Sequence, residues 1–240
     1  MAVEDHLPKG YTPHIGETRQ YWRDIILGVN DGLVSIFLLV VGVVSGGLER
    51  PAVLLTAVAG AIAGAISMAS GEYLATKSQD EVLLAELALE RSHIEQFRGV
   101  EMRQLRGFFR DMGIEEDDLD GVMAAFETND EAILNAMAAL EFGVVDSERR
   151  SPYLAMAASG LLFLAGSVPS IAPFVFIDSV GVALAVATIL TLAGLYLVGA
   201  VKGYVAKSSR IKSGLENLVI AGIGGLIAWG IGYLFGATVA

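Results

Sequence analysis

Long apolar runs separated by polar stretches dominate the chain, in place of the short apolar repeats of a soluble domain. A helix needs about 20 apolar residues to cross about 30 Å of hydrocarbon, and stretches of that length occur in five places. They cover residues 25–46, 52–74, 153–173, 179–201 and 215–238. The pattern therefore predicts an all-α integral membrane protein with five transmembrane helices and with its termini on opposite sides of the bilayer.

Composition supports this prediction. The 240 residues are 54% hydrophobic, with a mean hydropathy of +0.58, which is too apolar for an ordinary soluble domain. Residues 1–22 are polar and acidic, so they resemble neither a signal peptide nor a transit sequence. The chain has no cysteine, which excludes disulfides and thiolate metal ligands.

The distribution of lysine and arginine predicts the orientation. Of the 16 basic residues, 15 precede the first apolar run or lie between the second and third or the fourth and fifth, and only Arg50 lies elsewhere. Cytoplasmic flanks retain positive charge. We therefore expect the N-terminus and residues 77–150 to be cytosolic and the C-terminus to lie outside the cytosol.

Four segments follow from this topology. They are a cytosolic N-terminal segment (1–23), transmembrane helices 1 and 2 (24–76), a cytosolic acidic helical domain (77–150) and transmembrane helices 3 to 5 (151–240). The acidic domain holds 18 acidic and 8 basic residues, and so carries nearly all of the chain's net charge of -11. Such a surface repels nucleic acid and attracts cations.

The acidic domain reads as three helices, over residues 77–111, 115–126 and 129–142, with breaks at Gly113 and at Thr128 and Asn129. Thr128 precedes Glu131 by three residues, which is the capping-box spacing that begins a helix. We expect a three-helix module between transmembrane helices 2 and 3.

Helical phase predicts that this module binds metal. On the first helix, residues able to ligate through oxygen or nitrogen share a stripe about 80° wide; they are Glu86, Glu90, His93, Glu101 and Gln104. Glu90 and His93 have the Glu-x-x-His spacing of di-iron bundles. On the third helix, Met137 and Glu141 are four residues apart and share a face. The alternative is a solvated acidic hairpin, because Leu83 and Phe97 share the stripe and could make it a packing face.

Asp31 lies about seven residues into the first apolar run, which is about 10 Å deep at 1.5 Å per residue. A carboxylate there costs a few kcal/mol, so it should face a cavity, a partner helix or an ion path. Met68, in the second run, is expected at a similar depth, with Glu72 one turn nearer the cytosol. Carboxylates with one thioether suit Fe(II) or Mn(II) better than Mg(II) or Ca(II). Packing is the alternative role for Met68, and an interfacial position for Glu72.

The motifs carry a family resemblance over residues 20 to 238. They are "GVNDGLVS" in the first run, "SMASGEYLATKSQDE" at the end of the second, the acidic insertion, and "SGLENLVIAGIGGLIAWGIGYLFG" in the fifth. The combination resembles the vacuolar iron transporter family, whose bacterial members are membrane transporters of iron or manganese. The resemblance implies a five-span homodimer in a bacterial inner membrane. Such a protein exchanges Fe(II) for protons, exports the metal from the cytosol along the dimer interface, and collects metal in its cytosolic domain.

The resemblance also implies roles for single residues. The family's membrane aspartate, pathway methionine and GEY glutamate match Asp31, Met68 and Glu72. Its cytosolic ligands match Glu90, Glu101, Met137 and Glu141. His93 and Gln104 stand where further glutamates are expected, and Gly60 where some relatives place another membrane acid.

The predicted function is therefore proton-coupled export of Fe(II), with Mn(II), Zn(II) or Co(II) as other substrates and no prosthetic group. Its partners are metal ions, protons, the lipid bilayer and a second copy. A membrane-tethered ferritin-like protein that oxidises or stores iron is the alternative. The chain has three histidines and one Glu-x-x-His motif, whereas such a centre needs two. A non-transporting scaffold gives no reason for Asp31.

Overall fold

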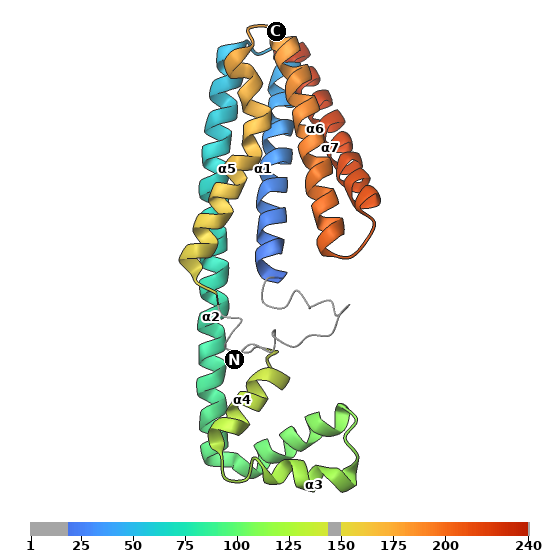
Figure 1. Ribbon diagram of the computed structural model, residues 1–240. Coiled ribbons are helices and arrows are strands. Elements are labelled where there is room, and N and C mark those ends of the chain that lie inside the picture. The colour runs from blue at the N-terminus through green and yellow to red at the C-terminus, as the bar shows by residue number, and fades with distance from the viewer. Residues whose placement is uncertain (1–18, 144–149, 240) are drawn as a thin grey trace, which may run out of the picture. The chain divides into compact units, whose positions relative to one another are not determined.

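The computed structural model describes residues 19–143 and 150–239, and the regular secondary structure of this part of the chain is entirely helical (Figure 1). The helices are α1 (Arg19–Ser45), α2 (Arg50–Asp111), α3 (Glu116–Ala124), α4 (Asp130–Leu140), α5 (Pro152–Phe176), α6 (Val180–Val205) and α7 (Arg210–Val239). The chain forms two compact units. We call Met1–Glu72 with Tyr153–Ala240 the membrane unit, and Tyr73–Pro152 the acidic unit.

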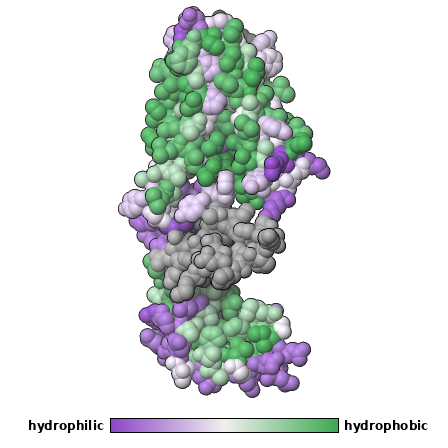
Figure 2. Space-filling model, in the orientation of Figure 1, coloured by the Kyte–Doolittle hydropathy of each residue, from purple (hydrophilic) through white to green (hydrophobic). Residues whose placement is uncertain are grey.

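Five helices of the described residues, α1, α2, α5, α6 and α7, are long and apolar enough to cross a membrane. This confirms the all-α fold and the five spans. Hydrophobic residues cover the face of the membrane unit seen in Figure 2, where the acidic unit shows many hydrophilic ones. The apolar surface is what lipid requires, because a spanning helix satisfies its backbone hydrogen bonds internally and presents side chains to hydrocarbon.

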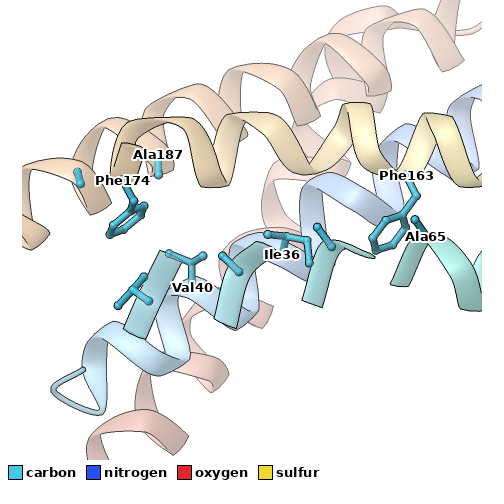
Figure 3. Close-up of a cluster of buried hydrophobic side chains, with 10 residues drawn as sticks. Ile36, Val40, Ala65, Phe163, Phe174 and Ala187 are labelled. Atoms are coloured by element: carbon cyan, nitrogen blue, oxygen red, sulfur yellow. The ribbon is translucent and has the colours of Figure 1, made fainter. Parts of the chain in front are cut away.

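The core of the membrane unit lies among α1, α2, α5 and α6 (Figure 3). Phe163 and Phe174 of α5 are almost fully buried and pack with Ile36 and Val40 of α1. The remaining members are mostly alanines of α2 and α6: Ala57, Ala61, Ala65, Ala183 and Ala187. Small residues suit helix contacts in lipid, where close packing replaces the hydrophobic driving force.

Helices α1 and α5 approach each other closely at two glycines. A Cβ atom on Gly32 would meet the carbonyl oxygen of Phe163, and one on Gly166 would meet the carbonyl oxygen of Val29. Because both obstacles are backbone atoms, a larger residue at either position would separate the helices. This contact fixes how far α1 can rotate or slide against α5.

The side chain of Arg50 caps the C-terminal end of α5. Its Nε donates to Phe174 O at 2.8 Å, its Nη2 donates to Val175 O at 2.8 Å, and its Nη1 pairs with Asp178 at 2.5 Å. The last carbonyls of a helix have no intrahelical donors. The side chain therefore satisfies groups that would otherwise need water at the end of a membrane helix.

The acidic unit has a separate apolar core, and ion pairs tie its helices together. Its core residues come from α2, α3 and α4: Ile94, Leu105, Met123, Ile133, Leu134 and Met137. Arg106 of α2 pairs with Glu116 at 2.8 Å and Asp120 at 2.6 Å, both on α3. The module is therefore packed, rather than a solvated hairpin.

Two local predictions for this unit were wrong. The side chain of Asn129, not that of Thr128, caps α4 by accepting from Ala132 N at 3.0 Å. The helix predicted over residues 77–111 is also not a separate, unbroken helix. It is the second part of α2, and it breaks at Phe97, which has φ -132° and ψ 34°.

Candidate metal site

Three predicted ligands come together in the acidic unit. The ligand atoms of Glu90, His93 and Glu101 all lie within 4.8 Å of one another. His93 Nδ1 is 3.9 Å from Glu90 Oε2 and 3.8 Å from Glu101 Oε1. These separations exceed a hydrogen bond, but one ion bound about 2.1 Å from each atom could bridge them.

The break at Phe97 makes this cluster possible. Glu90 and Glu101 are eleven residues apart, which places them about 16 Å apart along a straight helix. The break instead turns the chain back, so that both carboxylates meet His93. Helical phase placed these three residues on one stripe, together with Glu86 and Gln104, while the contact among the three depends on a break that it did not predict.

Arg98, next to the break, holds the turned segment. Its Nη2 donates to Phe126 O at 3.0 Å and to Glu127 O at 2.7 Å, and its Nη1 pairs with Asp130. These partners join α3 to α4. One arginine thus fixes the chain after the break against the segment that begins α4.

Both carboxylates of the cluster are buried. Glu90 is 4% exposed and Glu101 is 5% exposed, and Glu90 Oε1 has no hydrogen-bond partner among the described residues. A buried, unpartnered carboxylate oxygen costs free energy and calls for an explanation. A metal ion bound by this oxygen would provide one.

The pKa of Glu90 is raised from its ordinary value of 4.5 to about 6. Burial is the largest cause, the negative charges of Glu101 and Glu141 also raise the pKa, and His93 opposes the rise. Removing a carboxylate from water disfavours its charged form, and nearby carboxylates add repulsion. A divalent cation would relieve both effects.

The remaining predicted ligands are not part of this three-residue cluster. Glu141, at the end of α4, is close enough for its charge to affect Glu90. Met137 is fully buried in the apolar core of the unit. Glu86 is exposed and Gln104 is half-buried. Whether these four complete the coordination stays a prediction.

The donor set is two carboxylate oxygens and one imidazole nitrogen. Carboxylates alone suit Mg(II), Ca(II) or Mn(II), whereas imidazole suits Fe, Zn and other later metals. The mixed set therefore fits a first-row divalent transition ion best.

Metal binding at this cluster should weaken as pH falls through about 6. Glu90 must lose its proton to ligate, and its raised pKa places that loss near pH 6. Below this pH the proton competes with the metal, and affinity should fall roughly tenfold per pH unit. Mn(II) titrations of the full chain between pH 5 and 8 would measure this dependence.

The same raised pKa predicts the opposite trend for the metal-free protein. The stabilising contribution of a protonated Glu90 is fully present below about pH 4.5 and is lost as pH rises through about 6.

For the metal-binding prediction, equal Mn(II) affinity at pH 5 and pH 7 would contradict a role for Glu90 as a ligand.

The membrane candidates lie in a different setting. Asp31 of α1 is half-buried. It accepts a hydrogen bond of 2.9 Å from Oγ of Ser35, an exposed residue one helical turn further along. Met68 packs at the edge of the apolar core of the membrane unit. Glu72 lies 3.6 Å from Arg23 Nη2. The described contacts thus show a polar pair at Asp31, packing at Met68 and an ion pair at Glu72.

Sequence reasoning missed the hydrogen bond between Asn217 and Asn30, the residue that precedes Asp31. Asn217 of α7 donates through Nδ2 to Asn30 Oδ1 at 3.2 Å and to Leu195 O at 3.2 Å. A single asparagine in an apolar run was the signal available, since polar groups inside membrane helices need partners. Its partners could not be read from periodicity.

Comparison with known proteins adds independent information. The sequence matches the VIT family over residues 22–233. It is similar to "Vacuolar iron transporter 2" of Oryza sativa subsp. japonica, at 29% identity over 96% of this chain and 92% of that protein. "Vacuolar iron transporter 1" of Eucalyptus grandis is 30% identical over 87% of this chain and 84% of that protein. "Vacuolar iron transporter" of Centaurea cyanus is 30% identical, with 95% and 93% covered.

Proposed function

The chain belongs to the VIT family, and from this premise we propose that it exports Fe(II) from the cytosol in exchange for protons. The relatives named as vacuolar iron transporters support iron transport. Mn(II) is the second proposed substrate, because the donor set fits both ions. The family match also indicates a transporter rather than an enzyme, which disfavours the ferritin-like alternative.

The observation that carries the metal part of this proposal is the Glu90, His93 and Glu101 cluster with its unpartnered Glu90 Oε1. In the proposed mechanism this cluster collects metal at the cytosolic side. The excess of acidic residues around it raises the local concentration of cations. Metal binding here would precede entry into the membrane unit.

Asp31 is the residue proposed to pass the ion through the membrane. Its carboxylate and the Ser35 hydroxyl lie on a side of α1 that the single chain leaves partly exposed. A carboxylate open to hydrocarbon is costly, so a second copy of the chain is the proposed cover for this side. The homodimer would then place two copies of Asp31 along one path, where each can exchange a metal ion for a proton.

The proposed orientation puts the acidic unit in the cytosol of a bacterial cell, with the chain in the inner membrane. The basic residues in the predicted cytosolic flanks support this topology. A reporter inserted near Asp117 should be active only inside the cell, and one fused after Ala240 only outside. The reverse result would reverse the proposed direction of transport.

His93 should bias the cluster toward the later transition metals. Replacing it as His93→Glu exchanges a nitrogen donor for an oxygen donor at a side chain that is 40% exposed, so the fold should persist. We expect the ratio of Co(II) to Mn(II) affinity to fall by roughly tenfold. Competition titrations with the two metals on the purified chain would measure this ratio.

Gln96→Glu is the matched control, because it adds the same charge at an exposed position on the same helix. It should leave the metal ratio unchanged. If His93→Glu and Gln96→Glu gave the same ratio, imidazole ligation at this cluster would be wrong.

The transport proposal itself is tested with inverted membrane vesicles from cells that express the chain. Fe(II) uptake that depends on the chain, and that exceeds uptake of Mg(II) and Ca(II), supports it. Oxygen consumption on addition of Fe(II), without uptake, would instead favour the iron-oxidising alternative.

A further inference from the structure

A polar bridge joins three helices of the membrane unit beside Asp31. The two hydrogen bonds of Asn217 Nδ2, each 3.2 Å long, connect α7 to Asn30 of α1 and to the backbone of Leu195 in α6. Asn30 and Asn217 are both half-buried. Carboxamides between membrane helices are retained where they hydrogen-bond, since an unpaired one in hydrocarbon is costly.

Gly32, the residue that follows Asp31, is also held in place by a neighbouring helix. Gly32 packs directly against the backbone of Phe163 in α5, where a Cβ atom would not fit. In the segment Asn30-Asp31-Gly32, the first residue is therefore bonded to Asn217 of α7, which also bonds α6, and the third is held against α5.

These two attachments determine where Asp31 points. Successive residues of a helix are about 100° apart, so Asp31 lies between the side held by Asn217 and the side held by α5. Its carboxylate accepts from Ser35 on the partly exposed side of α1. Rotation of α1 would move the carboxylate away from this side, and the Asn30–Asn217 bond opposes such rotation.

We propose that Asn217 is a positioning residue for transport, which orients Asp31 through its hydrogen bond to Asn30. This inference rests on the proposed function, because it assigns Asn217 a part in the passage of the ion. Asn217 does not need to touch the ion. Its contribution is to keep α1 in the rotation that presents Asp31 to the path.

The test is Fe(II) flux into proteoliposomes as a function of Fe(II) concentration. Asn217→Leu removes both hydrogen bonds at similar side-chain volume, and it should raise the concentration for half-maximal flux roughly tenfold. Asn217→Gln keeps the carboxamide and should recover most of the wild-type value. The double variant of Asn30→Leu with Asn217→Leu should be no worse than Asn217→Leu alone, because the two side chains act as one unit.

Thr191→Val is the matched control. It removes another interhelical hydrogen bond of the membrane unit, the 3.0 Å contact between Ser170 and Thr191, which does not involve α1. It should lower Tm about as much as Asn217→Leu and leave the half-maximal concentration unchanged.

Each outcome has a distinct meaning. If wild type transports and Asn217→Leu behaves like Thr191→Val, the bridge is only structural and the positioning role is wrong. Additive effects of the Asn30 and Asn217 substitutions would also overturn it. A wild-type chain that shows no flux would overturn the transport proposal itself, together with the inference that rests on it.

Discussion

Asp31→Asn is expected to reduce Fe(II) flux by at least about 100-fold, more than the loss usually caused by disturbing an outer-shell partner. The substitution keeps the shape of the side chain and removes its charge. An amide at this depth cannot neutralise a divalent ion or carry a proton back. Insertion and dimer content should be unchanged, since α1 keeps its apolar contacts and its glycine packing. Flux into proteoliposomes and the oligomeric state in detergent would be measured on the same preparation.

Glu49→Gln is the matched control for this substitution. It makes the same change from acid to amide at an exposed position between α1 and α2, outside both helices. Its flux should equal that of wild type. Normal transport by Asp31→Asn would mean that the acid serves packing or assembly, and the proposed path would be wrong.

Glu90→Gln is expected to lower the affinity of the acidic unit for Mn(II) by about 10- to 100-fold at pH 7. The variant loses one of the two buried carboxylates of the cluster. It should also raise the Tm of the metal-free protein at pH 7, because it removes a buried charge whose pKa is raised. Metal titration and thermal unfolding, both on the full chain, would measure these two effects.

Lower Mn(II) affinity together with a higher Tm of the metal-free protein would distinguish a metal ligand from a residue that supports the fold. Glu95→Gln changes an exposed acid of the same helix and should alter neither affinity nor Tm appreciably. If Glu95→Gln weakened Mn(II) binding as much as Glu90→Gln, the binding would be a diffuse attraction of cations to the acidic surface. A fall in Tm for Glu90→Gln would indicate that Glu90 supports the fold.

The membrane helices were predictable because lipid imposes a simple rule. Each span needs about 20 apolar residues in one helix, and that pattern is visible without any knowledge of contacts. Asp31 was found for the same reason, since an acid stands out in an apolar run. The packing of Gly32 against Phe163 could not be read from the sequence, because it depends on which helices are neighbours.

The acidic unit shows where the sequence signal ends. Helical phase placed Glu90 and Glu101 on one stripe, but a straight helix would have kept them about 16 Å apart. The break at Phe97 could not be predicted from a proline, because none lies near it in the sequence. Arg98 stabilises the chain after the break through partners about 30 residues further on, and such long-range contacts override local helix propensity.

The prediction of the N-cap of α4 was wrong for a different reason. Thr128 and Asn129 are both good N-cap residues, and the spacing to Glu131 favoured the first. The structure uses Asn129, whose side chain reaches Ala132 N. The error is a single residue, and it does not affect the site.

The most direct test of metal–proton exchange uses proteoliposomes that contain only the purified chain. A lumenal iron indicator and a lumenal pH indicator would be followed together after Fe(II) is added outside under an imposed pH gradient. We expect Fe(II) to enter faster when the lumen is more acidic, and the lumen to become alkaline as protons leave. Absence of flux above that of protein-free liposomes would contradict iron transport, and Fe(II) entry without proton movement would contradict the exchange.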